Sequence, residues 1–218
     1  MAEQGVSLYL SIPVCSFRKG MAREYFETEG VPPPSTIYGF LLALLGEEDR
    51  SVYQGAQLAY ALLTIPAKSV ILRTTWRLKV KSPPGIGSNR RPDYQEILTG
   101  LELVIWVAAG SLAQQLEAAA QDPSSLTRYG GLSLGESRDL INDIIWSPKL
   151  PPRAGLWLIL DEQGDLPLPV WVDHVGSMGT VYRQFRLQSL PLLQPAESDP
   201  RWITIHGPRS SPGRAAGG

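Results

Sequence analysis

The stretch Ser69-Val-Ile-Leu-Arg-Thr-Thr-Trp-Arg-Leu-Lys-Val80 alternates apolar side chains with basic or hydroxyl side chains. Successive side chains of a strand point to opposite faces, so this pattern predicts a strand with two different faces. One face is a basic stripe, which consists of Arg73, Thr75, Arg77, Lys79 and Lys81. The other face consists of Val70, Leu72, Thr74, Trp76, Leu78 and Val80. We predict that the basic stripe faces outward and that the other face lies in the core.

Acidic residues are missing from the segment that surrounds this strand. Residues 51–92 contain no Asp or Glu, and their seven basic residues are Lys68, Arg73, Arg77, Lys79, Lys81, Arg90 and Arg91. The formal net charge of the whole chain is -1, so the basic excess is local. A local basic face on a neutral protein fits a polyanion that is bound in one place. A solvated strand face explains the charges equally well, and the pattern alone leaves both interpretations open.

The composition indicates a folded protein that buries part of its surface in an assembly. Hydrophobic residues make up 43% of the 218 residues, which is enough for a core. Charged residues make up only 19%, whereas about 25% is usual. A lightly charged surface is typical of a subunit inside a complex.

The residue types argue against several other classes of protein. Cys15 is the only cysteine, which excludes an intrachain disulfide and fits a reducing cytoplasm. We find no apolar run of about 20 residues for a membrane span and no signal peptide, so we expect a cytoplasmic protein. One Cys and two isolated His cannot form a structural zinc site. Gly85-Ile-Gly87 lacks the ending of a phosphate-binding loop. We expect neither a metal nor a cofactor.

Hydrophobic periodicity predicts an α+β fold. We expect strands at residues 7–13, 58–64, 69–80, 101–108 and 140–146. A helix is expected from Ser35, as N-cap, to Gly46, as C-terminal cap, and a second at residues 111–121, with Ser111 and Gln114 forming a capping box. This order of strands and helices is typical of the ferredoxin-like fold of RNA-recognition domains.

The second half of the chain predicts a smaller β-rich part. Strands are expected at residues 155–161, 168–175, 184–190 and 202–206, after a boundary near Pro151. We therefore divide the chain into a ferredoxin-like domain over residues 1–150, with an inserted hairpin at about 66–95, and a β-rich part over 151–206. Residues 207–218 have the composition of a disordered tail.

Gly131-Leu-Ser133-Leu-Gly135 matches the Gly-x-Ser-x-Gly motif of serine hydrolases. That motif requires a strand ahead of the serine, and residues 127–130 do not have a strand pattern. His174 and His206 do follow in the order that a hydrolase needs. We interpret the match as a glycine-rich loop and keep the serine hydrolase as an alternative.

Four stretches together resemble a known family. They are Val31-Pro-Pro-Pro-Ser-Thr-Ile-Tyr-Gly39-Phe-Leu-Leu, Leu72-Arg73-Thr74-Thr75-Trp76-Arg77-Leu78-Lys79, Arg91-Pro92-Asp93-Tyr94 and Gly130-Gly-Leu-Ser-Leu-Gly-Glu-Ser137. They resemble the fifth family of CRISPR-associated proteins, a branch of the RAMP superfamily found in type I Cascade complexes. The resemblance extends over roughly residues 7–190.

The resemblance implies a ferredoxin-like core with a β-hairpin thumb. It implies that the chain caps the five-prime handle of the crRNA, that its partners are the Cascade backbone subunits and the large subunit, and that it meets target DNA only indirectly. One subtype of this family also cuts precursor RNA with Tyr, Lys and His. No Lys-His pair occurs in this sequence. We therefore expect a non-catalytic RNA-binding subunit, with an endoribonuclease of the same fold as the first alternative.

The expected RNA-binding residues combine the basic stripe with the motif residues. Lys and Arg would neutralise phosphates, and Tyr94 beside Arg90 and Arg91 is a candidate to stack on a base, although a rim aromatic fits as well. The assigned set is Arg18, Lys19, Arg23, Ser35, Tyr38, Arg73, Arg77, Lys79, Lys81, Arg90, Arg91 and Tyr94.

Overall fold

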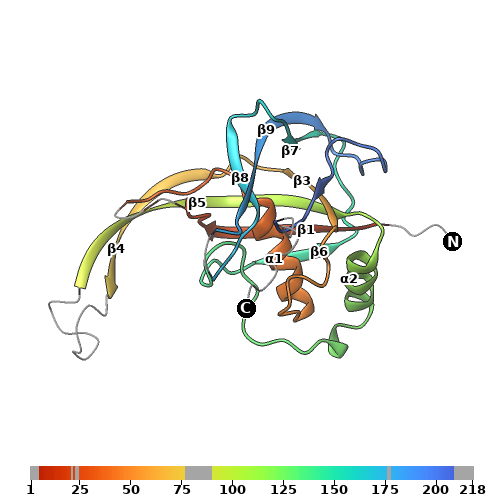
Figure 1. The fold of residues 1–218 in the computed structure, drawn as a ribbon, viewed down its shortest axis with the longest axis horizontal. Helices are drawn as coiled ribbons and strands as arrows, with labels where there is room; N and C mark the ends of the chain where they lie inside the picture. Colours follow the sequence, from red (N-terminus) through yellow and green to blue (C-terminus); the bar gives the residue numbers. More distant parts are fainter. Residues whose placement is uncertain (1–4, 21, 23–24, 77–89, 176–177, 209–218) are drawn as a thin grey trace, which may run out of the picture.

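The computed structural model describes residues 5–20, 22, 25–76, 90–175 and 178–208. Their strands are β1 (Val6–Cys15), β2 (Tyr25–Phe26), β3 (Gln57–Leu62), β4 (Ala67–Trp76), β5 (Arg90–Val107), β6 (Asp143–Trp146), β7 (Ala154–Leu160), β8 (Leu166–Trp171), β9 (Val181–Pro191) and β10 (Ile203–Thr204). The α-helices of this part are α1 (Pro34–Leu45) and α2 (Ser111–Gln121). The predicted α+β class is confirmed (Figure 1). No helix in these ranges is long and apolar enough to cross a membrane.

All the strands of the described part belong to one sheet. Its main path runs β6-β1-β5-β3-β7-β9-β8, while β2 and β4 pair with β5 and β10 pairs with β3. The sheet continues across the predicted boundary near Pro151, because β3 pairs with β7 through Ala61 and Trp157. The β-rich second half therefore extends the same sheet. The greater part of the predicted tail, residues 209–218, lies outside the described residues.

Helix α2 has the predicted bounds, but α1 begins earlier than predicted, and neither N-terminal cap is the predicted one. Helix α1 starts at Pro34 after an extended Pro33, so Ser35 is a buried residue of the first turn and not the N-cap. Proline fits this position because the first helical N–H has no partner within the helix. Helix α2 starts at Ser111 after Gly110, so the predicted capping box is wrong. The C-terminal cap is confirmed, since Gly46 adopts a left-handed conformation with φ 73°.

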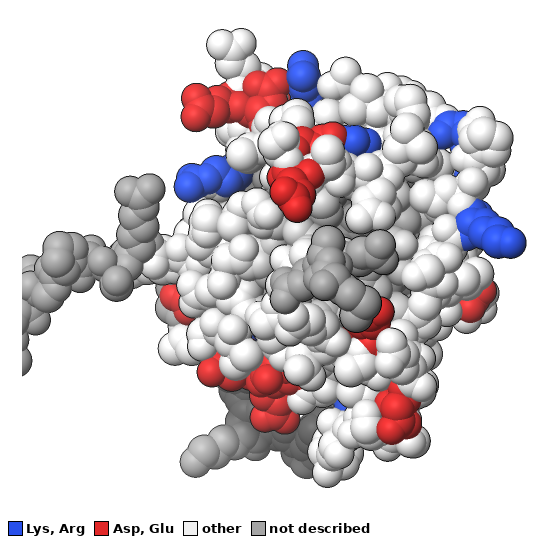
Figure 2. Space-filling model, turned by 90° about the vertical axis from the view of Figure 1, so that its right-hand side faces the viewer, with Lys and Arg blue, Asp and Glu red and all other residues white. Residues whose placement is uncertain are grey.

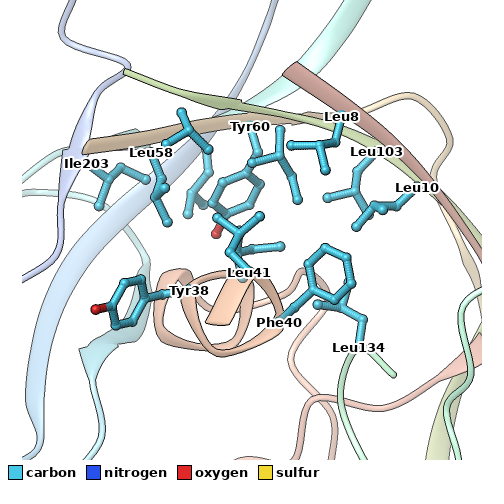
Figure 3. Packing of buried hydrophobic residues seen from close by; sticks show 14 of the residues in the cluster. Leu8, Leu10, Tyr38, Phe40, Leu41, Leu58, Tyr60, Leu103, Leu134 and Ile203 are labelled. Atoms are coloured by element: carbon cyan, nitrogen blue, oxygen red, sulfur yellow. The ribbon is translucent and has the colours of Figure 1, made fainter. Parts of the chain in front are cut away.

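The main core lies between the sheet and α1. Leucines of β1, β3 and β5 pack on Phe40 and Leu41 of the helix, and Leu134 of a distant loop closes the same cluster (Figure 3). The buried Tyr60 hydroxyl donates a hydrogen bond of 2.6 Å to the carbonyl of Pro32. This bond fixes the approach to α1 against β3.

A second cluster covers the opposite face of the sheet. The rings of Trp106 in β5 and Trp157 in β7 stack with their centroids 4.6 Å apart. The Arg201 guanidinium lies 4.3 Å from the centre of the Trp157 ring. Both tryptophans are buried, so the chain that follows β9 closes this face.

Strands β4 and β5 form a long hairpin that extends from the body of the protein (Figure 1). Its faces are the reverse of the prediction: Val70 is 50% exposed and Leu72 is 64% exposed. Arg73 points the other way and is partly buried, because Gln95 and Glu136 accept hydrogen bonds from its guanidinium. Arg90 and Arg91 belong to the start of β5. Residues 77–89 lie outside the described part of the chain.

This reversal predicts a large difference in stability between two leucine substitutions. Leu103→Ala should lower the free energy of unfolding by about 2–5 kcal/mol, because Leu103 is fully buried. Leu72→Ala should change it by about 0.5 kcal/mol or less, because that side chain already meets solvent. Chemical denaturation of both variants measures the difference. Equal losses would show that Leu72 packs in the core, as the alternation alone suggests.

Candidate functional site

Two of the motif-bearing segments meet at one cavity. Its volume is about 450 Å³, and it lies between α1, the glycine loop (residues 130–137) and the segment after β8. Ser35 and Gly39 of α1 line it on one side, and Ser133 and Gly135 line it on the other. We call it the first cavity. Segments about 100 residues apart in the sequence therefore face one another.

The glycine loop is anchored by one buried carboxylate. Asp139 Oδ2 accepts hydrogen bonds of 2.8 Å from the backbone amides of Ser16 and of Glu136. Burial raises the pKa of the Asp139 carboxyl, and the two amides oppose that effect. Gly135 has φ +114°, and a Cβ there would lie 2.6 Å from the Ser16 carbonyl oxygen. Only glycine lets the loop approach β1 so closely.

This loop does not have the geometry of a nucleophile elbow. Ser133 forms an isolated bridge with Leu140, and within residues 127–140 no strand precedes the serine and no helix follows it. The interpretation of Gly-x-Ser-x-Gly as a glycine-rich loop is confirmed. His174 does line the first cavity together with Ser133.

A polar cluster joins the glycine loop to the root of the hairpin. Arg73 Nη1 and Arg138 Nε lie 3.2 Å and 3.1 Å from the same carboxylate oxygen, Glu136 Oε2. Gln95 Nε2 donates hydrogen bonds of 3.1 Å to Glu136 Oε1 and 2.8 Å to Ser16 Oγ. The side-chain oxygen Oε1 of Gln95 accepts hydrogen bonds from both arginines. The polar cluster therefore links β4, β5, the end of β1 and the glycine loop.

Four of the predicted cations, all among the described residues, have partners within the chain. Arg73 is held in the polar cluster, and Arg91 Nε lies 2.9 Å from the buried carboxylate of Asp93. Lys19 is 3.9 Å from Glu27. The Arg18 guanidinium lies 4.1 Å from the centre of the Phe26 ring. A phosphate at these positions would have to share or replace these contacts.

The remaining predicted site residues differ in how exposed the structure leaves them. Tyr38 is fully buried and donates a hydrogen bond of 2.7 Å to the Arg50 carbonyl, so in this structure its side chain packs inside the protein. Tyr94 is 55% exposed, and its ring lies 6.5 Å from that of Tyr25. Arg90 is exposed at the start of β5. Arg23, Arg77, Lys79 and Lys81 fall outside the described residues.

Sequence reasoning missed Arg50 and Gln95. Arg50 lines the first cavity, donates to the carbonyl of Val172 and lies 4.5 Å from the centre of the Trp171 ring. Burial lowers the pKa of its guanidinium. No pattern around Arg50 marks it. The sequence does contain a pattern that points to Gln95. Asp93 and Gln95 are two positions apart, so they share one face of β5, and this face points inward.

Comparisons with known proteins give one relative and similar folds. No family model matches the sequence. The CRISPR-associated protein Cas5 of Myxococcus xanthus (strain DK1622) is 44% identical over 194 residues, which cover 85% of this chain and 91% of that protein. A chain of a CRISPR RNA-guided surveillance complex has a TM-score of 0.60 at 15% identity, with 91% of this chain and 96% of that chain covered. A crystal structure of a Cas protein has a TM-score of 0.52 at 16% identity, covering 86% and 95%.

The tight loop predicts that two glycines of the first cavity respond differently to alanine. Gly135→Ala should lower the free energy of unfolding by about 2 kcal/mol or more, because the new Cβ would meet backbone at a positive φ. Gly39→Ala should be neutral or stabilise by up to about 1 kcal/mol, since a Cβ there meets nothing within 4 Å and Gly39 lies inside α1. Thermal melts of both variants test this. A neutral Gly135→Ala would show that the loop is not held as described.

Proposed function

The chain belongs to the Cas5 family of CRISPR-associated proteins, and from this premise we propose that it is a non-catalytic subunit of a type I Cascade effector complex that binds the five-prime handle of the crRNA. The similarity in fold to a chain of a CRISPR RNA-guided surveillance complex supports the assignment to an effector complex. Backbone subunits and the large subunit are the proposed protein partners. Target DNA is met only through the assembled complex.

The sheet order supports the ferredoxin-like part of this proposal. Strands β1, β3, β5 and β6, with α1 after β1 and α2 after β5, follow a βαββαβ order, and they lie in the sheet as β6-β1-β5-β3. We interpret these elements as the ferredoxin-like core. Strand β4 and the first half of β5 then form the thumb, which extends away from that core (Figure 1).

The observation that carries the RNA-binding proposal is the convergence at the first cavity. The segment that starts α1 and the glycine loop both line it, and both carry the sequence resemblance. Single-stranded RNA is held by cationic groups that follow its backbone and by groups that receive its splayed bases. Arg50, Ser35 and Thr36 line the first cavity, as do Glu47 and Glu48. The polar cluster then fixes the angle of the hairpin beside it.

The low charge of the surface supports the proposal that the chain is a subunit of a larger complex. One face of the molecule shows mainly uncharged side chains, with Lys, Arg, Asp and Glu scattered among them (Figure 2). Helix α2 has the same character, since its exposed positions are Ser111, Gln114, Gln115, Glu117, Ala118 and Gln121. A surface of this kind suits contact with other subunits more than isolation in water.

We predict binding of repeat-derived RNA without cleavage. The complex that contains the full chain should retain the RNA, and the RNA should stay intact without metal ions, because no Lys-His pair is present in the sequence. Cleavage that His174→Ala or His206→Ala abolishes would establish the endoribonuclease instead.

Salt dependence tests whether the thumb contacts phosphates. Arg77→Ala and Lys79→Ala should each weaken RNA binding for any handle sequence and flatten the log–log salt dependence by roughly 0.7 per lost contact. Lys149→Ala, an exposed charge outside the hairpin, is the matched control and should change neither. If both hairpin variants keep the wild-type affinity and the wild-type salt dependence, the thumb does not contact the phosphates of the RNA.

A further inference from the structure

A second cavity lies where the segment between β1 and α1 meets β8 and β9. Its volume is about 610 Å³, which is within the range of roughly 300–1,000 Å³ for small-molecule sites. Pro33, Pro167 and Pro169 line it and supply apolar surface without backbone N–H donors. Val172 lines this cavity and also the first cavity, so the two are neighbours.

Glu29 places a carboxylate with unused acceptors in the second cavity. Burial raises the pKa of this carboxyl, with the charge of Glu27 adding to the effect and that of Lys19 opposing it. Among the described residues, none donates a hydrogen bond to the Glu29 side chain. The other carboxylates are engaged, since Glu27 pairs with Lys19 and Asp173 accepts from the amides of Val175 and Gly179. An occupant with donor groups would satisfy Glu29.

Tyr182 supplies the aromatic surface of the second cavity. It belongs to β9, is 49% exposed and pairs with Pro169 across the strands. Its hydroxyl lies 3.0 Å from where a Cβ on Gly20 would be, so the absence of a side chain at Gly20 allows this approach. A half-exposed ring beside proline surface can receive a flat apolar group.

Cations lie at the same cavity. Arg18 and Lys19 both line it, and Arg18 is oriented by its contact with Phe26 and by a hydrogen bond of 2.9 Å to the carbonyl of Ala22. An apolar slot, an aromatic ring, a carboxylate and two cations together match the parts of one nucleotide.

We infer that the second cavity holds one unstacked nucleobase of the bound RNA, a base with an amino group on its Watson–Crick edge. This inference rests on the proposed function. Glu29 accepts from the amino group, Tyr182 stacks on the ring, and Arg18 and Lys19 contact the neighbouring phosphates. Uracil fits less well, because its one Watson–Crick donor, the N3–H, is flanked by two carbonyl oxygens that cannot donate to a carboxylate.

Base substitution in the RNA tests the inference. The complex with the full chain is titrated with handle RNAs in which each position in turn is changed to uridine. One position should show a loss of affinity of about tenfold. Glu29→Ala should abolish this preference at that position alone. Tyr182→Ala should weaken binding of every RNA by about tenfold, whereas Tyr182→Phe should bind as the wild type does.

Two controls separate the possible failures. Glu117→Gln on α2 should leave the preference unchanged, and melting temperatures confirm that each variant is folded. If the wild-type complex retains RNA but tolerates uridine at every position, or if Glu29→Ala keeps the preference, the base site is wrong and the proposed function stands. If the wild-type complex does not retain the RNA, the proposed function itself fails.

Discussion

The carboxylate of Asp139 holds together parts of the chain that the rest of the site depends on. By accepting from the amides of Ser16 and Glu136, it attaches the glycine loop to the end of β1. Ionised acceptors of backbone N–H groups make strong hydrogen bonds, and the contact is largely shielded from water. Because Glu136 is then held in a fixed position, its ion pairs also fix the positions of Arg73 and Arg138. Loop, strand and hairpin root therefore act as one rigid unit.

The charges of that unit balance internally. Lys68 meets Glu96, Arg73 meets Glu136 and Arg91 meets Asp93, so the described part of the basic excess in the sequence is partly matched by carboxylates in space. Such pairs orient side chains more than they add net attraction for a distant polyanion. This explains how a protein with formal net charge -1 can carry a basic strand. It also shifts the expected phosphate contacts toward groups that line the cavities, such as Arg18 and Arg50.

Sequence periodicity identified most elements but not which face of the hairpin lies inward. Residues such as Leu8, Leu10 and Leu41 follow simple strand or helix patterns, and burial confirms them. The β4 pattern shows two faces, yet only the partners decide which is buried, and Arg73 finds Glu136 at a distance of 63 residues along the chain. Alternation contains no information about such a partner. The two N-terminal cap predictions were wrong for a related reason, since Pro34 and Gly110 set the helix starts more strongly than nearby Ser residues do.

The proline-rich start of α1 has a structural reason that the sequence pattern alone did not provide. Pro33 lines the second cavity, and Ser35 lines the first, so this short segment runs between the two. The Tyr60 hydroxyl holds the carbonyl of Pro32, and residues 31–35 are all buried. Prolines restrict the backbone before folding, so a wall built from them loses little further entropy when it becomes ordered. A rigid partition between two neighbouring cavities would keep adjacent nucleotides of one strand apart, which is the condition for bases to be received singly and not as a stack.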